Sequence, residues 1–195
     1  KKEIKTKKVF SVSTVKNWIS NLPFELTKDQ LSSIDDILYD LKSTHVMFRL
    51  VQGDVGCGKT IVAQISMYAN QLAGYQSALL APTEILARQH VKNMHKLGLE
   101  ATLYVSSLAA KEKKEILEKL ENGKIFNVVG THALFQENVV FHKLGLVIAD
   151  EQQRFGVKQR RSLLEKGKCV DFLMMSATPI PRTYAHFLYG DMDIS

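Results

Sequence analysis

The residues Gly53-Asp54-Val55-Gly56-Cys57-Gly58-Lys59-Thr60 form a complete G-x-x-x-x-G-K-[ST] pattern, and this stretch decides the fold. Glycines let successive backbone N–H groups turn inward around phosphate oxygens, and a helix that follows adds the positive end of its dipole. Lys59 is then expected to reach the β- and γ-phosphates, and the Thr60 hydroxyl to take a position on Mg²⁺. The whole loop is therefore the predicted nucleotide-binding site.

The flanks of this loop agree with that interpretation. The pattern binds phosphate only between a strand and a helix. Residues 45–51 are a short β-favouring run, and residues 61–72 repeat apolar side chains at helical spacing. An ordinary glycine-rich turn, the alternative, would not require either flank.

Strands and helices alternate along the rest of the chain. Helical spacing predicts helices over 15–19, 84–97 and 111–120, and a helix that runs from an N-cap at Thr27 to Leu41. Short apolar runs without polar alternation predict buried strands at 77–81, 102–105, 125–129, 144–149 and 172–175. Such strands separated by helices indicate an α/β fold, a mostly parallel sheet with helices on both faces.

The composition is that of a soluble globular protein. The chain has 195 residues, 45% hydrophobic and 24% charged. No run of 18 apolar residues exists, so a transmembrane span is not expected, and the N-terminus lacks the apolar region of a secretory signal. Two cysteines far apart indicate a reducing compartment. We expect a basic leader over 1–22 and one domain over 23–195.

The net charge of +6 is concentrated in the leader. Five lysines against Glu3 give +4 within residues 1–8, which leaves +2 for the remainder. A terminal lysine run is usually a solvated tail, so the charge does not demonstrate nucleic-acid binding. Trp18 either anchors the leader to something outside the chain or packs on its own domain.

A second chemical motif follows the strand expected at 144–149. Asp150 at a strand end is suited to hold Mg²⁺, through water, beside the phosphates of a nucleotide. The adjacent Glu151 is placed to orient and deprotonate an attacking water. Together with the glycine loop, these carboxylates predict a site that hydrolyses a nucleoside triphosphate.

Two further stretches are ambiguous by themselves. Ser176 and Thr178 lie in a proline-rich turn, where short hydroxyl side chains either hydrogen-bond the acidic loop and relay changes at the γ-phosphate or simply form a turn. The amide of Gln30 offers a donor and an acceptor that match adenine, although a lone glutamine is usually a surface residue.

The order of these motifs resembles superfamily 2 helicases and, more narrowly, the RecG family of ATP-dependent DNA helicases, from about residue 20 onward. The resemblance rests on Leu22–Gln30, Gln52–Thr60, Ala81–Ala87, Gly130–Leu134, Asp150–Val157 and Ser176–Thr183.

The resemblance implies a role for each matching residue. Gln30 would read adenine with Phe24 nearby, Lys59 and Thr60 would hold phosphate and Mg²⁺, and Asp150 and Glu151 would bind Mg²⁺ and activate water. The residues implied in coupling hydrolysis to motion are Gln153, Ser176 and Thr178. The residues implied in contacts to a DNA backbone are Thr83, Arg88, Thr131 and His132; a capping or merely exposed histidine is the alternative for His132.

Two positions depart from the family pattern. Gln153 stands where RecG proteins usually have His, and the related transcription-repair coupling factor carries Gln there. Cys57 replaces a commoner Ser, either as a thiol acidified by the helix N-terminus or as a passive loop residue.

The resemblance also implies the whole machine. The chain would be the first RecA-like P-loop motor domain of a monomeric, cytoplasmic, nucleoid-associated enzyme that uses ATP and Mg²⁺ to remodel stalled forks and Holliday junctions. A second RecA-like domain and a wedge domain would lie outside the chain. Because an arginine finger from the second domain contributes about 10³–10⁵ in rate, the chain alone is expected to be nearly inactive. A transcription-repair coupling translocase and a stand-alone nucleotide-binding regulator are the alternatives.

Overall fold

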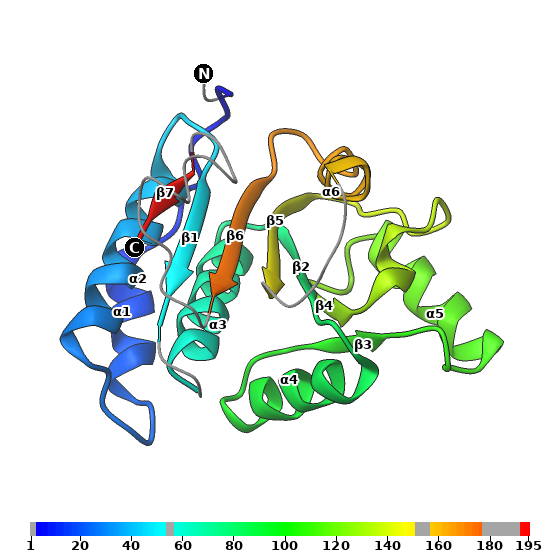
Figure 1. The fold of residues 1–195 in the computed structure, drawn as a ribbon, viewed down its shortest axis with the longest axis horizontal. Coiled ribbons are helices and arrows are strands. Elements are labelled where there is room, and N and C mark those ends of the chain that lie inside the picture. Colours follow the sequence, from blue (N-terminus) through cyan, green and yellow to red (C-terminus); the bar gives the residue numbers. More distant parts are fainter. Residues whose placement is uncertain (1–2, 54–56, 151–156, 177–191) are drawn as a thin grey trace.

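The fold is built on a parallel β-sheet (Figure 1). The computed structural model describes residues 3–53, 57–150, 157–176 and 192–195. Within these residues the sheet has seven strands in the order β3-β4-β2-β5-β6-β1-β7, and every pairing is parallel. The strands are β1 (Phe48–Gln52), β2 (Gln76–Leu80), β3 (Thr102–Tyr104), β4 (Asn127–Gly130), β5 (Leu144–Asp150), β6 (Asp171–Ser176) and β7 (Asp193–Ile194).

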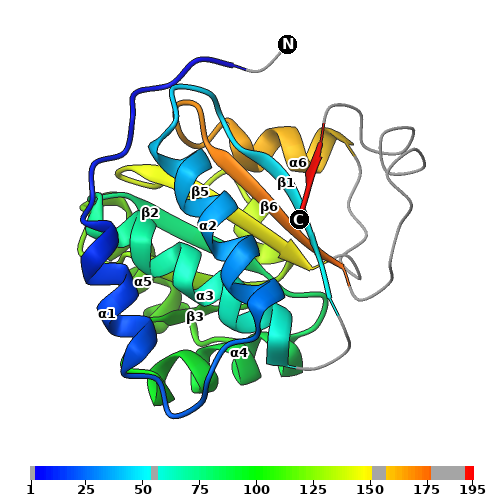
Figure 2. The same cartoon turned by 90° about the vertical axis from the view of Figure 1, so that its left-hand side faces the viewer.

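Helices cover both faces of the sheet, so each face has its own apolar core (Figure 2). One core joins the strands to α1 (Val12–Ser20), α2 (Lys28–Lys42), α3 (Cys57–Leu72) and α4 (Glu84–Lys96). The other joins them to α5 (Ala110–Glu121), the 3₁₀ helix η1 (His132–Phe135) and α6 (Val157–Leu164). The central strands β2 and β6 are buried along their whole length, which explains their unbroken apolar pattern.

The sequence analysis is confirmed for the fold class and for each predicted helix and strand, with shifts of a few residues at their ends. Thr27 is the N-cap of α2: its Oγ1 accepts the N–H of Gln30 at 3.1 Å, and Gln30 Oε1 accepts the N–H of Thr27 at 2.8 Å. This capping box satisfies two backbone donors at the helix start. The elements that were not predicted are η1, α6 and β7.

The expectation of a solvated lysine tail is wrong for two of its lysines. Lys5 and Lys8 are buried, with Nζ 2.8 Å and 2.7 Å from Oδ2 of Asp171 at the start of β6. A carboxylate that is fully buried requires cationic partners, and the leader supplies them. Trp18 packs on its own domain, because its ring stacks on Tyr68 of α3 at 4.7 Å between centroids. Among the described residues, no helix is long and apolar enough to cross a membrane.

Candidate functional site

The predicted nucleotide motifs meet at the carboxyl edge of the sheet. Parallel strands end at the same edge, and there β5, β6 and β1 are neighbours, with Gln52 beside Ser176 and Asp150 beside Met175. The N–H of Gly53 donates to the carbonyl oxygen of Ser176 at 3.1 Å. The first glycine of the loop and the first residue of the proline-rich turn are therefore directly bonded, and Asp150 lies on the next strand.

Helix α3 begins inside the glycine loop, at Cys57, earlier than the helix expected from residue 61. Its amino end therefore follows β1 closely, which places the positive end of a helix dipole at this edge. Thr60 lies in the first turn of α3 and is half-buried. Helix α3 carries the chain from β1 back to β2 across β6 and β5. The loop lies beyond the carboxyl ends of the strands, the side on which parallel sheets bind ligands.

Several predicted site residues lie outside the described part of the chain: Asp54, Val55, Gly56, Glu151, Gln153 and Thr178, together with the side chains of Cys57 and Lys59 and the surroundings of Gly58. Their roles stay predictions.

His90 is a residue of this edge that the sequence analysis missed. It lies on α4, and burial lowers its pKa while the carboxylate of Asp150 opposes that shift. The imidazole is therefore neutral at neutral pH and lies within electrostatic reach of Asp150. Its Nδ1 is buried without a hydrogen-bond partner among the described residues. Nothing in the sequence marked it, because a single histidine in a polar helix carries no local signal.

The residues expected to meet adenine lie near the connection between α1 and α2, at the lower end of Figure 1, where the strands also end. The Phe24 side chain is 47% exposed, so its ring is open to a ligand. The Oε1 of Gln30 already accepts the N–H of Thr27. The capping box therefore fixes the orientation of the Gln30 amide at the start of α2.

The residues expected to contact DNA follow two neighbouring strands, β2 and β4, whose ends are joined by the N–H of Ala81 and the carbonyl of Gly130 at 2.8 Å. Thr83 is the N-cap of α4, with Oγ1 accepting the N–H of Leu86 at 3.2 Å. Thr131 is almost buried before η1, and its carbonyl accepts the N–H of Leu134 at 3.1 Å. Their backbones are thus held in place at the same edge.

The two basic residues of this set, Arg88 and His132, are exposed. Arg88 lies on the outer side of α4, and His132 lies in η1 with its ring 5.8 Å from that of Phe135. Arg88 also lines an open groove of about 550 Å³ along α4, whose further basic members are Lys92, His95 and Lys96. The charged side chains of Arg88, Lys92 and Lys96 on one helix face give a positive surface that suits a phosphate backbone. The sequence analysis had singled out only Arg88.

The comparisons with known proteins agree with this geometry. The family model for DEAD/DEAH box helicases matches residues 27–187. The chain belongs to the DEAD/DEAH box helicase family. The matched region includes the glycine loop, the acidic loop and the proline-rich turn, so the family assignment covers each motif of the carboxyl edge.

Several relatives of the chain are named RecG. The ATP-dependent DNA helicase RecG of Staphylococcus aureus is 53% identical over 95% of this chain, and that of Staphylococcus epidermidis is 52% identical over 95%. A structure of RecG bound to a three-way DNA junction matches 98% of the chain with a TM-score of 0.85 and 44% identity, over 26% of that protein. The UvsW helicase of bacteriophage T4 shares the fold, with a TM-score of 0.69 at 15% identity, over 97% of this chain and 68% of UvsW. The chain spans 28% of the length of the curated relatives.

Proposed function

We propose that this chain is the ATP-binding motor domain of a RecG-like helicase that remodels branched DNA. The observation that carries the proposal is the convergence of Gly53, Asp150 and Ser176 on three adjacent strand ends beside the start of α3. The relatives' name and the junction-bound structure support branched DNA as the substrate. ATP is the proposed nucleotide.

Mg²⁺ is the proposed metal of the site. The Thr60 hydroxyl and the Asp150 carboxylate are hard oxygen donors, the type that Mg²⁺ prefers, and Mg²⁺ usually completes its shell with phosphates and waters. When bound it neutralises charge on the transferring phosphate. Two residues of this chain would then have distinct roles: Lys59 would bind the phosphates, and Glu151 would deprotonate the attacking water. His90, kept neutral by burial, would add no positive charge beside Asp150.

Coupling would run through the bond between Gly53 and Ser176. If loss of the γ-phosphate moves the glycine loop, the hydrogen bond from Gly53 would move Ser176, and with it Thr178. Gln153 would couple the acidic loop to the same movement. Thr83, Arg88, Thr131 and His132 would contact the DNA backbone. We further propose that the complete protein contributes a second RecA-like domain and works as a monomer in the bacterial cytoplasm, associated with the nucleoid. The division into a leader over 1–22 and a motor domain over 23–195 stays a prediction.

The test is ATP hydrolysis by the complete protein, with and without forked DNA. Strong stimulation by the fork, lost in Glu151→Gln, is expected. ATP binding without such stimulation would contradict the proposal. It would favour the second candidate, a transcription-repair coupling translocase, for which Gln153 is the supporting residue, or a nucleotide-binding regulator.

The separate chain should hydrolyse ATP at least about 10³-fold more slowly than the complete protein; equal rates would refute the need for a second domain.

A further inference from the structure

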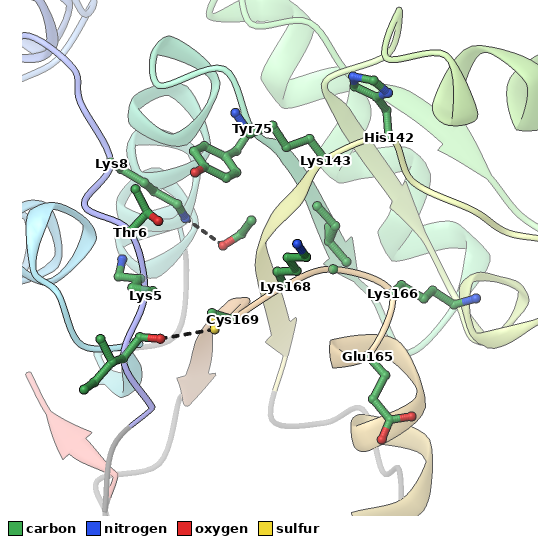
Figure 3. Close-up of a pocket in the computed structure, with 14 residues that line it drawn as sticks. Lys5, Thr6, Lys8, Tyr75, His142, Lys143, Glu165, Lys166, Lys168 and Cys169 are labelled. Atoms are coloured by element: carbon green, nitrogen blue, oxygen red, sulfur yellow. Dashed lines mark hydrogen bonds between the residues drawn. The ribbon is translucent and has the colours of Figure 1, made fainter.

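A second cavity lies at the opposite edge of the sheet, where β2, β5 and β6 begin (Figure 3). It has a volume of about 790 Å³. The charged side chains of its lining are mostly lysines: Lys5, Lys8, Lys143, Lys166 and Lys168, against the single carboxylate of Glu165. None of these residues belongs to the nucleotide motifs.

The base of the cavity carries an unbalanced charge. Lys5 and Lys8 both donate to the same oxygen, Oδ2 of Asp171, so two ammonium groups share one carboxylate. Lys5 also donates to the carbonyl of Leu41 at 2.9 Å, and Lys8 to that of Gly145 at 2.7 Å. Because buried like charges are expensive without a counter-charge, this cluster favours the arrival of an anion. Burial lowers the pKa of Lys8 to about 8; Asp171 opposes this shift, and Lys5 adds a smaller lowering.

The walls of the cavity add further lysine side chains that can contact an anion. Lys143 Nζ lies 4.3 Å and Lys8 Nζ 5.0 Å from the centre of the Tyr75 ring, so one ring holds two ammonium groups near each other. The ring can lie there because residue 145 is glycine: a Cβ would come within 2.7 Å of Tyr75 Cδ1. Lys168 makes no hydrogen bond or ion pair with a described residue, and Figure 3 shows it between Lys8 and the loop that carries Lys166.

Lys166 does not take part. Its Nζ donates to the carbonyls of Gln136 at 2.8 Å and Val139 at 2.7 Å, and Figure 3 shows it directed away from the other lysines. Glu165 is likewise drawn pointing outward. Among the described residues, the inner space is therefore lined by cations whose near carboxylate, Asp171, is shared between Lys5 and Lys8.

We propose that this cavity binds an anion of the phosphate class, with Lys143 and Lys168 as its direct contacts and the Lys5–Asp171–Lys8 cluster as its positive base. A phosphate offers several acceptor oxygens that match converging ammonium donors. The anion is either free phosphate or a phosphate of a DNA backbone. It occupies the amino edge of the sheet, away from the glycine loop, so it is distinct from the nucleotide.

The experiment measures hydrogen–deuterium exchange of the complete protein, in peptides that cover residues 143–146 and 166–171. Inorganic phosphate at ten times its Kd, compared with chloride at equal ionic strength, should slow exchange there up to about 10-fold. Lys143→Ala and Lys168→Ala should abolish this protection. Both positions are at least partly exposed, so the variants should fold.

Two matched variants separate the cavity from other sites. Lys111→Ala removes an exposed lysine of α5, and Lys59→Ala disables the predicted phosphate loop; both should keep the protection at the amino edge. Equal protection in all four variants, or none in the parent protein, would overturn the proposal.

A 20-base-pair duplex in place of phosphate identifies the source of the anion. If the duplex protects the parent protein but not Lys143→Ala or Lys168→Ala, the anion is a DNA phosphate. If the duplex gives no protection in the parent protein, the anion is the free ion. If the parent protein shows this protection but no ATP hydrolysis stimulated by forked DNA, the proposed function alone is refuted.

Discussion

The two edges of one sheet use charge in opposite ways. At the carboxyl edge, Gly53, Asp150 and Ser176 lie at strand ends, where we propose that backbone groups and a carboxylate bind a nucleotide. At the amino edge, Asp171 is turned inward and fully buried between Lys5 and Lys8. The first arrangement can be recognised in a short string of residues, whereas the second joins residues more than 160 positions apart. Binding chemistry that is encoded in a short stretch of residues can therefore be recognised in the sequence, whereas a charge cluster buried between distant segments cannot.

The largest expected effect tests the buried edge. Asp171→Ala leaves two buried ammonium groups unpaired and removes the acceptor for the N–H of Met47, which donates to Oδ1 at 2.7 Å. Breaking a buried pair in this way costs about 3–5 kcal/mol in the free energy of unfolding. Urea denaturation checks this value. The control is Asp35→Ala, which removes the exposed partner of Lys16 and should cost less than about 1 kcal/mol. Similar losses in both variants would show that the Asp171 cluster is not a special feature.

The next prediction tests the ligand-facing edge. Lys59→Ala should lower ATP affinity about 100-fold, because a charge-assisted contact to phosphate contributes about 1.5–3 kcal/mol. Without ligand, its melting temperature should stay within a few degrees of the parent, since the lysine is expected to face ligand and not core. Calorimetric titration and thermal unfolding measure the two quantities, with Lys111→Ala as the control. An unfolded Lys59→Ala variant would make the loop a structural element and remove the contrast between the edges.

The pH dependence of stability gives a third test. Burial lowers the pKa of Lys8 to about 8, against the opposing effect of Asp171, with a further lowering by Lys5. The unfolded chain keeps the ordinary lysine value, so between pH 8 and about 10 the unfolded state binds more protons and the free energy of unfolding rises with pH. The penalty is fully present below pH 8. Over this pH range, the free energy of unfolding of the parent should rise by about 1–3 kcal/mol more than that of Lys8→Met. Parallel pH profiles would show that Lys8 titrates normally.

Sequence reasoning succeeded where local pattern and tertiary position coincide. The apolar run of β5 predicts a buried strand, and Thr27 with Gln30 marks a helix start. It failed for α6, whose residues Val157–Leu164 are mostly polar and which buries Leu163 against the sheet. It also failed for the two-residue strand β7, which exists by pairing with β1 and has no pattern of its own.

The same limit applied to the candidate sites. The motif residues could be named because phosphate chemistry restricts them to glycine, lysine, threonine and carboxylates at fixed spacing. The proximity of His90 to Asp150 and the burial of Lys5 and Lys8 depend on which helices and segments the folded chain brings together. A lysine-rich terminus is compatible with either a solvated tail or a buried cluster until the position of Asp171 is known.

The smallest expected effect concerns the basic face of α4, which we propose contacts DNA. Lys92→Ala and Lys96→Ala each remove one cation from the groove that Arg88 lines. If each contacts one phosphate, the slope of log K against log salt for duplex binding should become shallower by about 0.9 per variant, without a change in sequence preference. Fluorescence anisotropy at several salt concentrations measures the slope. Lys114 is an exposed lysine of α5, a helix that packs on the other face of the sheet, so Lys114→Ala should leave the slope unchanged. If Lys114→Ala shifts the slope as much as Lys92→Ala does, the protein binds DNA through its general charge, and the face of α4 has no particular role.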